Sequence, residues 1–122
     1  MGFSVVILES DAKVAQSLAG KLSSHFHAVH LTRSGDELRK HVVTNHPEVV
    51  ILDLEYSRLT DVQSLRQDFP TLPIVCTHRI PDEHFWVEAM DAGASDVCRA
   101  DDVQNVVTSA LRGVAMAQSA AA

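Results

Sequence analysis

The chain has 122 residues, and its ten Lys and Arg against sixteen Asp and Glu give a formal net charge of −6. This length suits one domain that buries its own core without disulfides or metals. Because the chain is acidic and has no cluster of Lys and Arg, we expect no direct binding to nucleic acid. The first apolar run, residues 5–8, is too short to cross a bilayer and follows no basic segment. We therefore expect a cytoplasmic protein with no signal peptide and no membrane contact.

Short apolar runs alternate with helical patterns along the whole chain. In chain order the patterns predict a strand at 5–8, a helix at 12–24, a strand at 28–32, a helix at 35–46, a strand at 48–54, a helix at 61–69, a strand at 72–77, a helix at 81–92, a strand at 94–99 and a helix from 102 onward. Side chains suited to N-caps precede four of the helices: Asp11, Ser34, Thr60 and Asp101. Pro81 suits a first helical turn, and Gly93 suits a left-handed C-cap.

Strands that alternate with helices in so short a chain are typical of a parallel sheet, because each parallel connection needs a right-handed crossover. We therefore predict an α/β fold with three layers, α/β/α, around a five-stranded parallel sheet of the flavodoxin-like, doubly wound type. Residues 1–113 form the predicted domain, and residues 114–122 form a flexible or helical Ala-rich tail. The two cysteines, Cys76 and Cys98, lie in apolar runs, so we expect packed, reduced thiols and no redox pair.

Acidic residues follow two of the predicted strands. Glu9 and Asp11 come after the first strand, and Asp53 and Glu55 come at the end of the most apolar one. The carboxyl ends of parallel strands meet at one edge of the sheet, where carboxylates raise one another's pKa unless a cation neutralises them. The pattern predicts a divalent metal site formed by these four residues. In the alternative interpretation, Asp11 only caps a helix and Glu9 is a solvated charge.

Four segments, at residues 9–11, 49–53, 72–78 and 92–96, resemble in order and spacing the receiver domains of bacterial response regulators, the CheY-like domains of two-component signalling. The resemblance covers essentially the whole chain. It implies that Mg²⁺ binds in the acidic pocket and that Asp53 accepts a phosphoryl group from a sensor histidine kinase or a phosphotransfer protein. Thr77 or His78 would contact that phosphoryl group, and the sequence leaves both registers open.

The chain also departs from the pattern of this family. Ser10 stands where a second acid usually ligates the metal, which would weaken Mg²⁺ binding. Ala100 stands where a lysine usually pairs with the phosphoryl group, and Val97 replaces the usual aromatic residue. Three arginines are candidates to replace the lysine: Arg58, Arg79 and Arg99. The resemblance is therefore to an atypical, degenerate receiver.

The predicted helix at 81–92 is apolar over a wide arc that includes Trp86 and Met90. The resemblance implies that the face from this helix to the last helix meets a downstream protein or a second copy of the chain, as a homodimer. In the alternative interpretation, Trp86 only covers the edge of the core.

The leading hypothesis is a stand-alone receiver in phosphorelay signalling, since no output domain is evident after Leu111. It would not be an enzyme beyond self-phosphorylation and slow autodephosphorylation at Asp53. A pseudo-receiver that acts only through protein contacts is the first alternative. A phosphatase of the haloacid-dehalogenase type is the second, suggested by the acids at 53 and 55. It fits poorly, because the motif is central and Lys40 is the last lysine.

Overall fold

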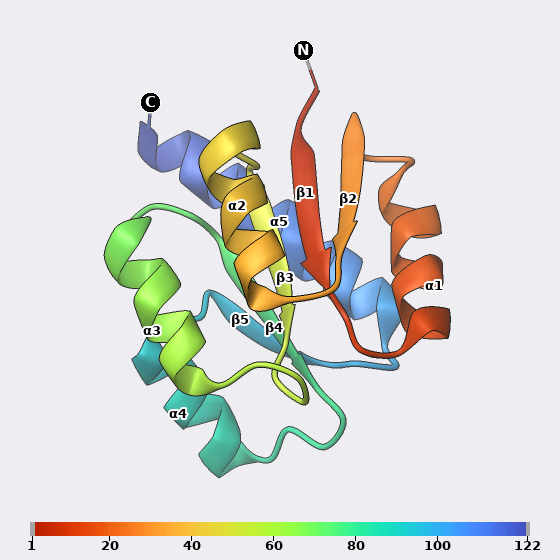
Figure 1. Ribbon diagram of the computed structural model, residues 1–122. Coiled ribbons are helices and arrows are strands. Elements are labelled where there is room, and N and C mark those ends of the chain that lie inside the picture. The colour runs from red at the N-terminus through yellow and green to blue at the C-terminus, as the bar shows by residue number, and fades with distance from the viewer. Residues whose placement is uncertain (1, 122) are drawn as a thin grey trace.

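The structure, a computed structural model, describes residues 2–121. The elements in chain order are β1 (Ser4–Leu8), α1 (Ala12–Leu22), β2 (Ala28–Thr32), α2 (Gly35–Asn45), β3 (Val49–Asp53), α3 (Leu59–Asp68), β4 (Ile74–His78), α4 (Glu83–Ala92), β5 (Asp96–Arg99) and α5 (Val103–Ala121). Within the described range, five strands form one sheet in the order β2-β1-β3-β4-β5, and all neighbouring strands run parallel (Figure 1). The predicted α/β fold class is confirmed.

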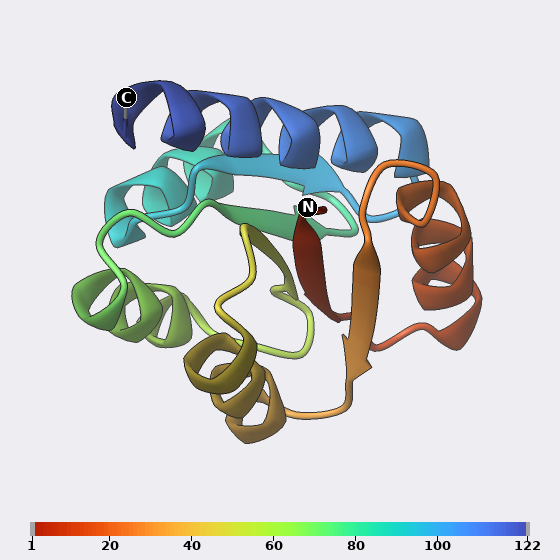
Figure 2. The same cartoon turned by 90° about the horizontal axis from the view of Figure 1, so that it is seen from above.

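Helices cover both faces of the sheet, which gives the three layers (Figure 2). One core lies between the sheet and helices α1 and α5, where Val5, Ile7, Val49, Ile51 and Val75 meet Leu18, Val106 and Ala110. The other core lies under α2, α3 and α4, where Val6, Leu8, Val50, Leu52 and Cys76 meet Leu38, Val62 and Ala89. This arrangement follows from strand geometry, because successive side chains of a strand point to opposite faces and both faces here are covered.

Strand β3 lies at the centre of the sheet, between β1 and β4. All five of its residues are buried. Ile51 and Leu52 supply the two cores from opposite faces, and each fully buried side chain of this size contributes about 1.5–3 kcal/mol of transfer free energy. The same strand brings Asp53 to the carboxyl edge of the sheet.

Several predicted helix ends differ from the structure. Helix α1 ends at Leu22, two residues before the predicted end. Helix α4 begins at Glu83 with Asp82 as its N-cap, so Pro81 lies before the helix and not in its first turn. The predicted cap of the third helix, Thr60, was also wrong, because α3 begins two residues earlier than predicted, with Arg58 at the N-cap position.

The predicted cap of the last helix was wrong by one residue. Asp102 accepts the N–H of Asn105, at 3.2 Å, and is therefore the side chain that caps α5. Asp101, the predicted cap, instead forms an ion pair with Arg99, at 2.9 Å. Adjacent aspartates offer the same capping chemistry, so the sequence alone did not distinguish them.

The two cysteines pack into different cores. Cys76 belongs to the core under α2, α3 and α4, and Cys98 belongs to the core under α1 and α5. Burial raises the pKa of the Cys76 thiol to about 12, and burial also raises the pKa of the Cys98 thiol. Because the thiols lie on opposite faces of the sheet, they do not form a redox pair, as predicted.

Helix α5 extends to Ala121 and so includes most of the segment predicted as a flexible or helical tail. Val114 of this segment is buried in the core with α1. The division of the chain at residue 113 remains a prediction. Across residues 2–121, no helix combines the length and the apolar character that crossing a membrane requires.

Gly93 and Gly20 provide a matched test of this fold. Gly93, the C-cap of α4, has φ of 119°, and an added Cβ would lie 2.7 Å from the Cβ of Arg66. Gly93→Ala should therefore lower the free energy of unfolding by about 1–2 kcal/mol in urea denaturation followed by circular dichroism. Gly20→Ala, in α1 where nothing lies within 4 Å of the added Cβ, should raise it by about 0.5–1 kcal/mol. Equal effects at the two sites would contradict the assigned backbone conformations.

Candidate functional site

A cleft of about 730 Å³ opens at the carboxyl edge of the sheet. The ends of β1, β3, β4 and β5 and the segments that follow them line it, with Glu9, Ser10, Asp53, Glu55, Arg79 and Arg99 among the lining residues. The acidic residues that follow two of the strands therefore lie at the same edge of the sheet, as predicted. The cleft carries acids on several sides and two arginines on the side of β4 and β5.

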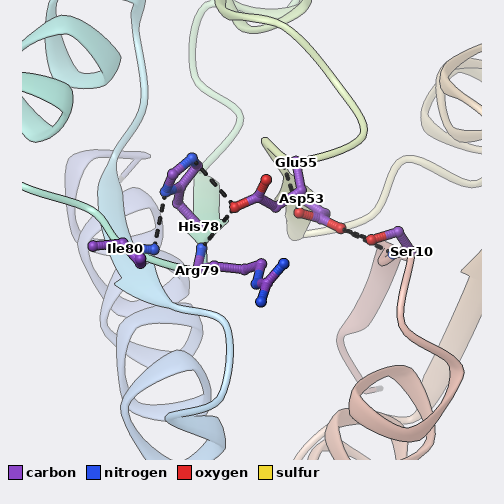
Figure 3. Close-up of polar contacts among 6 residues, drawn as sticks. All are labelled: Ser10, Asp53, Glu55, His78, Arg79 and Ile80. Atoms are coloured by element: carbon purple, nitrogen blue, oxygen red, sulfur yellow. Dashed lines mark hydrogen bonds and ion pairs between the residues drawn. The ribbon is translucent and has the colours of Figure 1, made fainter.

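Asp53 is buried at the base of this cleft, with only 1% of its surface exposed. Its Oδ2 accepts two hydrogen bonds from Ser10, one from the backbone N–H at 2.9 Å and one from the hydroxyl at 2.5 Å (Figure 3). Its Oδ1 accepts the backbone N–H of Glu55 at 2.8 Å. Burial alone would raise the pKa of Asp53, but these hydrogen bonds outweigh it and hold the pKa below the usual value. The carboxylate is therefore ionised at neutral pH.

Glu9 lies beside Asp53 and has the opposite electrostatic character. Burial raises the pKa of Glu9 to about 7, together with a side-chain hydrogen bond that protonated Glu9 makes to Asp53 and with the charges of Asp53 and Asp11. Its Oε2 accepts the backbone N–H of Asp11 at 3.1 Å, and no donor group reaches its buried Oε1. Two neighbouring carboxyl groups whose pKa values move apart are typical of functional sites.

The four carboxylates predicted as metal ligands do not converge on one point. Asp11 uses Oδ1 to accept the N–H groups of Lys13 and Val14, so it caps α1 as the alternative interpretation held. Glu55 points its carboxylate toward the segment after β4. Within residues 2–121, no three His, Cys, Asp or Glu side chains are arranged to hold a metal ion. Glu9 and Asp53 remain as the pair of acids that share the base of the cleft.

Thr77 and His78, the two candidates on β4, lie on opposite faces of the sheet. Thr77 pairs in register with Asp53, is fully buried and has a hydroxyl without a hydrogen-bond partner. His78 packs its ring against Phe85 of α4, with 4.2 Å between the ring centroids. Side chains of paired residues in parallel strands point to the same face, so Thr77 is the candidate on the face of Asp53.

Two of the three candidate arginines line the cleft. Arg79 lines it from the segment after β4, and within the described chain its guanidinium forms no ion pair. Arg99 lines it from the end of β5 but is paired with Asp101. Arg58 is at the N-cap of α3 and is not among the residues that line the cleft. No lysine contributes to the described lining of the cleft.

Sequence reasoning missed two interactions of this site. It treated Ser10 only as a poor metal ligand, whereas the structure makes it the main hydrogen-bond donor to Asp53. It also missed the contact between Glu55 and the segment after β4. The available signal for the first was a hydroxyl residue two positions after a strand, next to the strand that carries the buried aspartate. The second depends on side-chain directions in two loops, for which the sequence gives no signal.

Comparison with curated proteins finds response regulators among the relatives of this chain. No family model matches the chain. The response regulator MprA of Mycobacterium sp. (strain KMS) is 29% identical over 98 residues, which cover 75% of this chain and 41% of that protein. The chain therefore spans less than half the length of this curated relative.

Solved structures agree in fold. The N-terminal receiver domain of a two-component response regulator from Bacteroides fragilis superposes with a TM-score of 0.82 at 23% identity, over 91% of this chain and 95% of that one. The BeF₃-activated DrrB receiver domain superposes with a TM-score of 0.81 at 16% identity, over 94% of this chain and 99% of that one. The chain has the receiver-domain fold, and the resemblance to response-regulator receivers predicted from its sequence is confirmed.

Proposed function

We propose that this chain is a receiver module of cytoplasmic two-component signalling and that Asp53 accepts a phosphoryl group from a sensor histidine kinase or a phosphotransfer protein. The observation that carries the proposal is the state of Asp53, a buried and ionised carboxylate at the base of an open cleft. An ionised carboxylate is a nucleophile, and its place at the carboxyl end of the central strand puts it at the base of the cleft.

In the proposed reaction an oxygen of Asp53 attacks the phosphorus of a phosphohistidine. A P–O bond forms, the P–N bond breaks, and the departing imidazole keeps the electron pair and takes a proton from water. The N–H groups of Ser10 and Glu55, which now donate to Asp53, lie where they can donate to the new phosphoryl oxygens. The Thr77 hydroxyl, buried without a partner, is the further donor on this face.

The residues present fit a weak Mg²⁺ site. Mg²⁺ in phosphoryl-transfer sites is bound by one or two carboxylates together with phosphate oxygens and water. Glu9 and Asp53 supply two carboxylates, and the unpartnered Oε1 of Glu9 is an oxygen available to a cation. When bound, the ion would neutralise the oxygens of the transferred group. Ser10 contributes no charge, so the site would hold Mg²⁺ less tightly than a site of three acids.

A second candidate function is protein binding without phosphorylation. Trp86 is 43% exposed and lines, with Met90 and Met116, a groove of about 530 Å³ between α4 and α5. The hydroxyl of Ser10 already neutralises Asp53 in part, which favours a carboxylate that stays unmodified. In this case the face from α4 to α5 would bind a downstream protein or a second copy whatever the state of Asp53.

Beryllofluoride, which mimics a phosphoryl group on a carboxylate, separates the two functions. In the presence of Mg²⁺ the protein should give a bound ¹⁹F NMR signal, and Asp53→Asn should give none, because the amide cannot coordinate beryllium as a carboxylate does. Asp61→Asn, an exposed aspartate in α3, is the matched control and should bind as the unaltered protein does. Absence of a bound signal in the unaltered protein would refute phosphorylation at Asp53 and leave the protein-binding function.

Protons on Glu9 should compete with Mg²⁺. The pKa of Glu9 is raised to about 7, so the group is mostly neutral at pH 6 and mostly charged at pH 8. Mg²⁺ affinity should therefore be roughly tenfold weaker at pH 6 than at pH 8, measured by amide shifts of Ser10 and Asp53 in an NMR titration. Glu9→Gln should lower the affinity at pH 8 and remove the pH dependence. An unchanged pH dependence in Glu9→Gln would exclude Glu9 as the competing group.

Arg79 should supply the positive charge that the missing lysine supplies elsewhere. Arg79→Ala should weaken beryllofluoride binding about ten- to hundredfold, because a hydrogen bond to a charged group contributes about 1.5–3 kcal/mol. Arg58→Ala, which removes an arginine that does not line the cleft, is the control and should bind normally. Equal affinities of the two variants in the ¹⁹F titration would show that Arg79 does not contact the bound group.

A further inference from the structure

We propose that His78 is a positioning residue that links the charge state of Asp53 to helix α4, through Glu55 on one side and Phe85 on the other. The inference rests on the proposed function for its signal, since phosphorylation is the change that His78 would transmit. The connection itself is a set of contacts from the cleft to an exposed surface.

The first contact joins Asp53 to Glu55. The backbone N–H of Glu55 donates to Oδ1 of Asp53 at 2.8 Å, so the two carboxylates belong to one short segment. A phosphoryl group on Asp53 would add negative charge beside this N–H and near the Glu55 side chain. Repulsion between like charges would then displace the Glu55 carboxylate from its present position.

The second contact joins Glu55 to the segment after β4. Oε1 of Glu55 accepts the backbone N–H of Arg79 at 3.1 Å and lies 3.3 Å from Nε2 of His78 (Figure 3). Nδ1 of His78 accepts the backbone N–H of Ile80 at 3.1 Å, which assigns the proton of a neutral imidazole to Nε2, facing Glu55. Both ring nitrogens are therefore used, and the orientation of the ring depends on where the Glu55 carboxylate lies.

The third contact joins His78 to α4. The rings of His78 and Phe85 have centroids 4.2 Å apart and an interplanar angle of 32°. Phe85 lies in the first turn of α4, where its N–H donates to the N-cap Asp82 at 2.7 Å, and its neighbour Trp86 is 43% exposed. A rotation of the His78 ring would therefore change the packing at the start of α4 and the surroundings of Trp86.

Val97 does not offer a parallel route. Its side chain is 8% exposed and packed in the same core as Ala89 and Ala92 of α4, and it has no polar atom to respond to charge. His78, in contrast, combines a polar contact with Glu55 of the cleft lining with an aromatic contact at α4.

The test compares His78→Phe with the unaltered protein. Phenylalanine keeps a ring against Phe85 but removes both polar contacts, so the fold and beryllofluoride binding should persist. Binding is read from the bound ¹⁹F signal, and its effect on α4 is read from the amide shifts of Phe85 and Trp86 and from Trp86 fluorescence. The change at α4 on binding should fall at least fivefold in His78→Phe. His84→Phe, at an exposed histidine of α4, is the matched control and should keep the full change.

A double-mutant cycle tests the link between Asp53 and α4 even if beryllofluoride does not bind. Asp53→Asn alone removes the charge and should shift the amides of Phe85 and Trp86, and the same substitution in the His78→Phe background should shift them at least fivefold less. Equal shifts in the two backgrounds would overturn the inference. Missing ¹⁹F binding together with a smaller shift in the double variant would refute the proposed phosphorylation and support the link.

Discussion

The structure depends on the need to neutralise one buried charge. Strand β3 is buried along its whole length, so the carboxylate of Asp53, which follows four apolar residues in this strand, is buried as well. An ionised carboxylate in such surroundings is tolerated only when donors are directed at it. Three donors from two different strand ends meet this need, one hydroxyl and two backbone N–H groups. The connections after β1 and after β3 are therefore fixed in relation to each other by the chemistry of one side chain.

Ser10 has two consequences for the same carboxylate. Its hydroxyl stabilises the unmodified, ionised state, since a hydrogen bond to a charged group is stronger than one between neutral groups. Ser10 is also neutral, so no third acid competes with Glu9 for its proton. Glu9 and Asp53 therefore take different protonation states near neutral pH. A receiver with a second acid at this position would favour a bound cation. In this chain, hydrogen bonds from Ser10 and Glu55 stabilise the carboxylate of Asp53 instead.

The sequence was sufficient to predict features that depend on the periodicity of apolar residues. It was insufficient for features that depend on the local path of the chain or on the direction of a side chain. The burial of β3 and the approach of Glu9 to Asp53 follow from apolar runs and from the shared edge of parallel strands. The parallel, doubly wound type of the sheet also follows, from the alternation of strands and helices. The positions of helix ends were less certain, as Asp101 and Asp102 show, because neighbouring residues with equal capping ability differ only in the local path of the chain.

For the functional side chains, too, the sequence predicted which residues lie near the site but not which way their side chains point. The sequence left Thr77 and His78 open because a shift of one residue along β4 exchanges the faces, and pairing with Asp53 in the sheet decides which one shares its face. The direction of the Glu55 carboxylate depends on two loops that follow different strands. Such contacts are set by the packed structure as a whole, so short-range sequence patterns do not encode them.

The reactivity of the two buried cysteines measures how often the core of this fold opens. Cys76 is 0% and Cys98 is 2% exposed, and burial raises the pKa of both thiols, so neither reacts with a thiol reagent while the core around it is closed. They lie in the two separate layers of side chains on either side of the sheet. The rate of alkylation at each thiol therefore measures how often its own layer opens, and a comparison of the two rates distinguishes loosening of one helical layer from unfolding of the whole molecule.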